Sequence, residues 1–131
     1  MAAAVDDATT NVAELKAKVA AFVKERDWEK FHAPKNLAMA LACEAAELME
    51  EYLWMEAAES RAATEGADGS EGGERRARVE AEAADVAFCL LNLCNVVGID
   101  LASAMERKIA EASAKYPAEK VRGQSKKYDE Y

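Results

Sequence analysis

Apolar residues recur at three- and four-residue spacing in four successive segments of this chain, and this period constrains the fold more than any other feature. Such spacing places apolar side chains on one face of an α-helix. The four stripes are Leu15, Val19 and Phe22; Leu37, Leu41, Leu48, Tyr52 and Met55; Val79, Ala83, Val86, Leu90, Leu93 and Val97; and Leu101, Met105 and Ile109. The sequence therefore predicts an all-α protein, and four amphipathic helices with short connections favour a four-helix bundle.

Residues that favour helix ends give the boundaries of the first two helices. Asn11 and Glu14 have capping-box spacing, which predicts that the first helix begins there and ends near Asp27. Pro34 suits the first turn of the second helix, which is expected to run to about Ala58.

The third and fourth helices are bounded in the same way. The third is expected from about Glu74 to Val97, and Gly98 suits its C-cap. Asp100 is typical of an N-cap, so the fourth helix should begin directly after it and end near Lys115.

The remaining segments lack a helical period. We expect residues 1–10 to be disordered, residues 60–74 to form a mobile loop, and residues 118–131 to form a polar, extended tail around one helical domain at 11–117. A chain of 131 residues is long enough for one such domain. Because alanine fills many stripe positions, one copy would bury little apolar area, so self-association is expected.

Composition excludes some classes of partner. A net charge of −8 argues against a nucleic-acid polymer, because phosphate backbones require a basic surface. No apolar run approaches the roughly 20 residues that span a bilayer, so no membrane is expected, and the first ten residues lack a targeting pattern, which favours the cytoplasm. Cys43, Cys89 and Cys94 lie in apolar helical patterns and are expected to be reduced, core-filling thiols.

Two pairs of acids stand beside the apolar stripes. Glu44 and Glu47 lie three residues apart in the second helix, and Glu82 and Asp85 have the same spacing in the third. Each pair therefore projects from one helical face, and the pairs converge if the two helices pack antiparallel. Four oxygen ligands from two rigid helices suit Mg²⁺ or Mn²⁺.

The acid pairs allow three other interpretations. Both pairs are equally compatible with solvated surface carboxylates, because this spacing often arises by chance. A di-iron bundle requires Glu-x-x-His on two helices, whereas this chain has one histidine, His32, outside both pairs. A glycosidase needs only two acids with separated pKa values, so four acids in matched pairs fit metal binding better.

Longer motifs surround the acids. The stretch RDWEKFHAPKNLAMALACEAAELMEEYLW, the later EAADV and the KYP at 115–117 together resemble the MazG-like, all-α nucleoside triphosphate pyrophosphohydrolases, and most closely their dCTP pyrophosphatase branch. The resemblance covers roughly residues 22–117. It implies a MazG fold assembled as a homo-oligomer, most simply a dimer-based homotetramer with shared pockets.

The resemblance also implies roles for individual residues. It assigns Glu44, Glu47, Glu82 and Asp85 to Mg²⁺, with Mn²⁺ as a substitute, and the metal holds the phosphates of a nucleoside triphosphate. Glu47 is the candidate for orienting or deprotonating the attacking water. The implied nucleobase residues are Trp28, His32 and Trp54, and the implied phosphate contacts are Lys108 and, more weakly, Lys115. The expected reaction releases pyrophosphate from a nucleotide such as dCTP or a modified dCTP and leaves the monophosphate, which would clear unwanted nucleotides from the pool.

The chain departs from the family pattern at several positions. Cys43 and Ala46 replace glycines beside the first acid pair, Cys89 replaces a tyrosine, Ala112 replaces an asparagine, and Val19 replaces a histidine. These departures leave the acids intact and alter the expected substrate pocket. The alternative hypothesis is therefore a non-catalytic helical scaffold or nucleotide-binding protein derived from the same fold.

Overall fold

The structure is a computed structural model that describes residues 4–130. Its α-helices are α1 (Val12–Glu25), α2 (Pro34–Glu50), α3 (Ala57–Ala62), α4 (Glu71–Val97), α5 (Leu101–Lys115) and α6 (Ala118–Val121), and its 3₁₀ helices are η1 (Glu29–Phe31) and η2 (Tyr128–Glu130). The described residues contain no strand, which confirms the all-α prediction. The chain divides into two compact units, Met1–Gly98 and Ile99–Tyr131.

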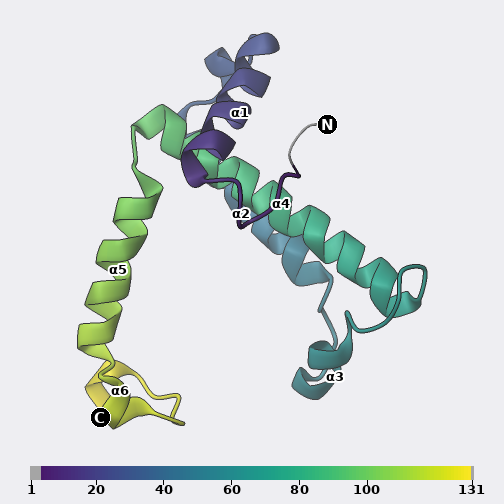
Figure 1. The fold of residues 1–131 in the computed structure, drawn as a ribbon, viewed down its shortest axis with the longest axis vertical. Helices are drawn as coiled ribbons and strands as arrows, with labels where there is room; N and C mark the ends of the chain where they lie inside the picture. The colour runs from purple at the N-terminus through teal and green to yellow at the C-terminus, as the bar shows by residue number, and fades with distance from the viewer. Residues whose placement is uncertain (1–3, 131) are drawn as a thin grey trace. The chain divides into compact units, whose positions relative to one another are not determined.

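The first unit is built around α4. Helix α2 lies alongside α4, and α1 packs on α4 as well (Figure 1). The buried apolar residues are Val19 and Val23 of α1, Leu37 of α2, and Leu91 and Cys94 of α4. This core is small, and it consists of three helices, because the predicted fourth helix belongs to the second unit. The four-helix bundle therefore stays a prediction.

The predicted helix caps are present. Asn11 Oδ1 accepts a hydrogen bond from the backbone of Glu14 at 2.9 Å, and Glu14 Oε2 accepts one from the backbone of Asn11 at 2.9 Å. Gly98 closes α4 with a left-handed φ of 77°, and Asp100 accepts from the backbone of Ser103 at 2.9 Å to begin α5. These short-range signals fixed the start of α1 and the junction between α4 and α5.

The prediction for residues 51–74 was wrong in two respects. Helix α2 ends at Glu50 rather than near Ala58, and turns lead to Trp54, whose φ of 69° is left-handed. The expected mobile loop, residues 60–74, contains the second half of α3 and the first turn of α4, which begins at Glu71. The apolar residues Tyr52 and Met55 continue the helical spacing past Glu50. The sequence pattern therefore did not reveal that α2 ends there.

Close packing explains why two glycines stand at the start of α4. A Cβ atom on Gly72 would lie 1.8 Å from the Glu65 carbonyl oxygen, and one on Gly73 would lie 2.2 Å from that of Ala67. Arg76 reinforces the same contact, since its guanidinium donates to the Gly66 carbonyl at 3.2 Å. The glycines therefore mark a tight approach between the connection and α4.

Some residues of the predicted apolar stripes are buried, whereas others are exposed. Leu37 is buried and Leu48 is partly buried, as expected, but Val97 is 51% exposed at the end of α4. The three cysteines are free thiols. Cys94 fills the core, whereas Cys43 is exposed, so the prediction of a buried Cys43 was wrong. Cys43 neighbours the inward-facing Glu44 and so points about 100° away around the helix.

The ends of the chain hold more local structure than expected. Residues 1–3 lie outside the described range, but Asp6 Oδ1 accepts from the backbone of Thr9 at 2.9 Å in a short turn. In the second unit, α6 and η2 occupy part of the expected extended tail, and the rings of Tyr116 and Tyr128 meet edge to face with centroids 6.4 Å apart.

None of the described helices, taken singly, has the length and apolar character of a membrane span. Only α4 and α5, taken together across their break, meet the criteria of length and composition.

Candidate functional site

The two helices α2 and α4 bring three of the predicted acids together. Single carboxylate oxygens of Glu44, Glu47 and Glu82 all lie within 4.8 Å of one another. Glu44 and Glu82 are partly buried, whereas Glu47 is exposed. The helices run antiparallel here, since Glu47 meets Glu82 while Glu51, one turn further along α2, meets Arg78, one turn earlier on α4.

Burial and mutual repulsion govern the electrostatics of this cluster. Burial is the largest cause that raises the pKa of Glu44, followed by the negative charges of Glu47 and Asp85. Burial likewise raises the pKa of Glu82, followed by the charges of Glu47, Asp85 and Glu44. A pKa raised by desolvation and like charge means that the ionised cluster is strained until a proton or a cation neutralises it.

One carboxylate oxygen of the cluster is buried without a hydrogen bond from the described residues. Glu82 Oε2 is buried, and no hydrogen-bond partner for it exists among the described residues. A buried carboxylate oxygen without a partner is unfavourable, and such groups are usually paired or coordinate a metal. The donor set consists of carboxylate oxygens, which hard divalent cations such as Mg²⁺ and Mn²⁺ prefer. The residues present therefore fit a divalent cation.

Asp85 and Cys89 border the same cluster on α4. The charge of Asp85 acts on both Glu44 and Glu82, although Asp85 itself is exposed. Burial raises the pKa of the Cys89 thiol, and the charges of Glu44 and Asp85 raise it further. Cys89 is thus held as a neutral thiol beside the acids rather than as a thiolate.

An ion pair lies beside the acid cluster, at the C-terminal end of α2. Arg78 Nε donates to Glu51 Oε2 at 3.1 Å and to Oε1 at 3.3 Å, and Arg75 lies 3.8 Å from Oε2. Arg75 also donates to the Glu51 backbone carbonyl. These two arginines hold the end of α2 against α4.

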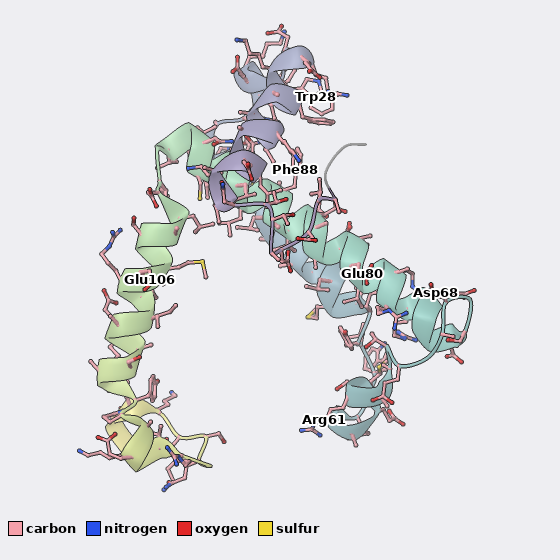
Figure 2. All side chains as sticks on the ribbon, viewed as in Figure 1. Trp28, Arg61, Asp68, Glu80, Phe88 and Glu106 are labelled. Carbon is pink, nitrogen blue, oxygen red and sulfur yellow. The ribbon has the colours of Figure 1, made fainter. Side chains whose placement is uncertain are left out.

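Aromatic residues form a second feature next to α1. The rings of Phe22 and Phe88 meet edge to face at 5.4 Å between centroids, Phe22 meets Trp28 at 5.9 Å, and Trp28 meets His32 at 6.5 Å. Figure 2 shows Trp28 near the end of α1 and Phe88 on α4. The structure thus brings together two of the predicted nucleobase residues, Trp28 and His32, and Trp28 remains 43% exposed.

His32 also borders a cavity. The cavity has a volume of about 500 Å³ and is lined by Ala20, Val23, Glu29, His32, Asn92, Asn95 and Val96. Asn92 is only 4% exposed, and its Nδ2 lies 3.1 Å from His32 Nδ1. Three lining residues are aliphatic and four carry polar groups, so the cavity offers a small molecule both apolar contacts and hydrogen-bonding groups.

The other predicted site residues do not join this arrangement within the first unit. Trp54 is 93% exposed in the connection after α2. Lys108 and Lys115 belong to the second unit, where Lys108 Nζ lies 3.2 Å from Glu111 Oε2 and Lys115 Nζ lies 5.4 Å from the Tyr128 ring centroid. Their roles stay predictions.

Sequence reasoning missed three residues of this region. Asn92 carried a signal, because an amide inside the apolar run LLNLCNVV has to find a partner. Arg75 and Arg78 carried a weaker signal. Their spacing places both cations on the same face of α4 as Glu82, which lies one turn after Arg78. Neither signal identifies the partner, which lies far away in the sequence.

The fold and the acids define an all-helical protein with a carboxylate cluster, E-x-x-E facing E-x-x-D, between two antiparallel helices. Residues 39–131 match the MazG-like family. The chain therefore belongs to the MazG-like family.

Individual relatives extend this comparison. Human dCTP pyrophosphatase 1 is 37% identical over 113 residues, which are 85% of this chain and 62% of the human protein. Rat dCTP pyrophosphatase 1 is 38% identical over 109 residues, with coverages of 83% and 61%. A pyrophosphatase from Archaeoglobus fulgidus has a TM-score of 0.70 and 32% identity, covering 87% of this chain and 99% of that one. This chain spans about three fifths of the length of the mammalian relatives.

Proposed function

We propose that this protein is a metal-dependent nucleotide pyrophosphohydrolase that converts a (deoxy)nucleoside triphosphate to the monophosphate and pyrophosphate. The leading substrate is dCTP or a modified dCTP, and the metal is Mg²⁺, with Mn²⁺ as a substitute. The observation that carries the proposal is the carboxylate trio of Glu44, Glu47 and Glu82 with an unpartnered, buried oxygen on Glu82. The similarity to dCTP pyrophosphatases and to an archaeal pyrophosphatase supports it.

The acids explain how an acidic protein would accept an acidic substrate. Glu44, Glu47, Glu82 and Asp85 would hold the cation, which when bound supplies charge neutralisation and Lewis-acid activation of phosphate oxygens. Glu44 and Glu82 are the partly buried members of the set, and they lie on facing helices. Without a cation the ionised acids would repel a triphosphate.

Glu47 is the candidate base because it is the exposed member of the trio. Its carboxylate can orient a water and accept a proton as the water oxygen bonds to phosphorus. The bridging phosphorus–oxygen bond between the α- and β-phosphates breaks, and pyrophosphate leaves. The exposure of Glu47 gives water and substrate access that the buried oxygen of Glu82 lacks.

The aromatic residues are proposed to hold the base. Trp28 offers a partly exposed ring next to His32, and Trp54 offers an almost fully exposed ring that a second copy of the chain can cover. The phosphate contacts are assigned to Lys108 and Lys115. Shared pockets of this kind require a homo-oligomer, for which we propose a dimer-based homotetramer.

The decisive experiment measures pyrophosphate release by the purified protein from a panel of nucleoside triphosphates, with Mg²⁺ and with a chelator. We expect release with Mg²⁺ only, and greatest with dCTP or a modified form of it. Glu47→Gln on α2 should abolish release, whereas Glu80→Gln, on the exposed surface of the facing helix α4 (Figure 2), should retain it. Nucleotide binding without release from any nucleotide would favour the non-catalytic alternative.

A further inference from the structure

The buried amide of Asn92 makes a specific contact with the chain's single histidine. Asn92 lies on α4, 60 positions from His32, and its Nδ2 is 3.1 Å from the ring nitrogen Nδ1. With 4% of its surface exposed, Asn92 has almost no access to water. Its amide therefore depends on His32 as a partner.

The chemistry of the two groups fixes where the hydrogen lies on the ring. An amide nitrogen can only donate, so the nitrogen facing it must accept. An accepting Nδ1 carries no hydrogen, and in a neutral imidazole the hydrogen then resides on Nε2. The contact thus selects one of the two neutral tautomers of His32 and leaves Nε2–H as a donor.

Neighbouring Asn95 provides an internal comparison. It also lies on α4 and lines the same cavity, but its Nδ2 donates to the backbone carbonyl of Lys16 at 2.9 Å. Asn95 therefore ties α4 to α1 through a group that cannot titrate or tautomerise. Asn92 differs because its partner is a side chain that lines the cavity and changes its hydrogen-bonding pattern with its tautomer.

We propose that Asn92 is a positioning residue that holds His32 in the Nε2–H tautomer, so that the cavity presents a hydrogen-bond donor to an acceptor atom of the bound nucleobase. A carbonyl oxygen or an unprotonated ring nitrogen of the base supplies such an acceptor. Glu29, another lining residue, supplies a carboxylate acceptor for an amino group. The identity of the ligand rests on the proposed function, whereas the tautomer does not.

The tautomer can be tested without any substrate. With ¹⁵N-labelled histidine the single ring gives one pair of nitrogen signals, whose chemical shifts show which nitrogen carries the hydrogen. We expect an unprotonated Nδ1 and a protonated Nε2 in the wild type. Asn92→Asp replaces the donor by an acceptor, so Nδ1 should gain a hydrogen. Asn95→Asp is the matched control and should leave the ring signals unchanged.

The wild-type spectrum alone can overturn the assignment. A hydrogen on Nδ1 of His32 in the wild type would overturn the assignment. This measurement does not depend on whether any variant folds. Ring signals that are the same in Asn92→Asp and the wild type would also overturn it, provided that the variant keeps its cooperative melting transition.

The ligand is tested by kinetics and by titration with dCMP. Asn92→Asp should raise KM for dCTP about tenfold, the loss of one hydrogen bond, and change kcat little. Unchanged KM in an active enzyme would refute the positioning role while the proposed function stands.

If the wild type releases no pyrophosphate, the proposed function fails, and the dCMP titration tests the positioning role instead. Then dCMP should shift the His32 ring signals of the wild type but not of Asn92→Asp, and unmoved wild-type signals would reject the inference.

Discussion

Glu51 and Arg78 form an ion pair that joins the end of α2 to α4, with 3.1 Å between Arg78 Nε and Glu51 Oε2. Glu51 lies one turn after Glu47, and Arg78 lies one turn before Glu82. The pair therefore sits directly beside the acid cluster and opposes the separation of the two helices that carry it. The Glu51 side chain is only 17% exposed, so water screens it little.

We expect Glu51→Gln to lower the free energy of unfolding by about 1–2 kcal/mol, because it weakens charged hydrogen bonds from Arg78 and Arg75 at a partly buried site. Urea unfolding followed by circular dichroism measures this. Glu111→Gln is the control, since the Lys108–Glu111 pair has side chains 75% and 60% exposed and should contribute about 0.5 kcal/mol or less. Equal effects of both variants would contradict the structural role of Glu51.

A divalent cation should stabilise the protein. Mg²⁺ or Mn²⁺ relieves the repulsion among Glu44, Glu47 and Glu82, and binding to the folded state alone raises Tm. Asp85→Asn and Glu47→Gln should each abolish turnover and reduce the metal-induced rise in Tm. Differential scanning fluorimetry over a metal titration measures the shift, with Glu80→Gln as the control. Full activity in Glu47→Gln or Asp85→Asn would remove the metal assignment.

The metal-free protein should respond to pH in an unusual direction. The pKa values of Glu44 and Glu82 are raised above their ordinary value of 4.5, chiefly by burial. A carboxyl with a raised folded-state pKa contributes stability that is fully present below the unfolded pKa and is lost as pH rises through the folded pKa. These two groups should therefore stabilise the metal-free protein as the pH falls from neutrality toward their ordinary pKa of 4.5.

Metal reverses this dependence, because the cation requires ionised carboxylates. The Tm difference between Mg²⁺ and chelator should thus grow as pH rises. Thermal melts at several pH values test this, and the double variant Glu44→Gln, Glu82→Gln should abolish both trends. A wild-type Tm difference that is independent of pH would show that these two acids are not linked to the cation.

Substitutions of the two tryptophans should raise KM alike but differ in their effect on Tm. Trp28→Ala and Trp54→Ala should each raise KM by about tenfold or more, since stacking on a base is worth roughly 1–3 kcal/mol. Trp28→Ala should also lower Tm, because Trp28 contacts Phe22 and His32, whereas Trp54→Ala should lower it less, because Trp54 is 93% exposed within its own chain. Trp54→Phe keeps an aromatic face and should restore most of the affinity.

Mixed oligomers test whether the tryptophans come from different chains. A mixture of the two alanine variants should regain some wild-type pockets, measured as low-KM activity after refolding together. Mixtures without recovered activity would count against shared pockets, and unchanged KM in both single variants would leave the tryptophans with a packing role.

Self-association should depend on an apolar groove between α1 and α4. The groove is lined by Leu15, Lys18, Val19, Phe22, Ala84, Ala87, Phe88 and Leu91. Ala87→Glu places a charge in it and should shift the protein toward monomer in light scattering at micromolar concentration. Ala77→Glu, exposed on the same helix outside the groove, should keep the wild-type mass. A monomeric wild type would refute the homo-oligomer.

Short-range signals in the sequence were enough for several parts of this protein. The helical period predicted an all-α chain. Side chains that accept from a backbone N–H three residues on mark the helix starts at Asn11 and Asp100, and the left-handed backbone of Gly98 marks the end of α4. The spacing of the acids predicted that each pair shares a helical face. These features depend on neighbours in the chain, so they can be read without knowledge of the fold.

Only the tertiary structure decided which distant groups meet. Three contacts each join residues from segments that are far apart in the sequence: Glu47 with Glu82, Glu51 with Arg78, and His32 with Asn92. The glycines at the start of α4 suggested a loop, because a pattern of single residues cannot reveal that a carbonyl from an earlier segment occupies the space of a Cβ. Packing between segments sets these contacts, and it depends on register and three-dimensional proximity rather than on local spacing.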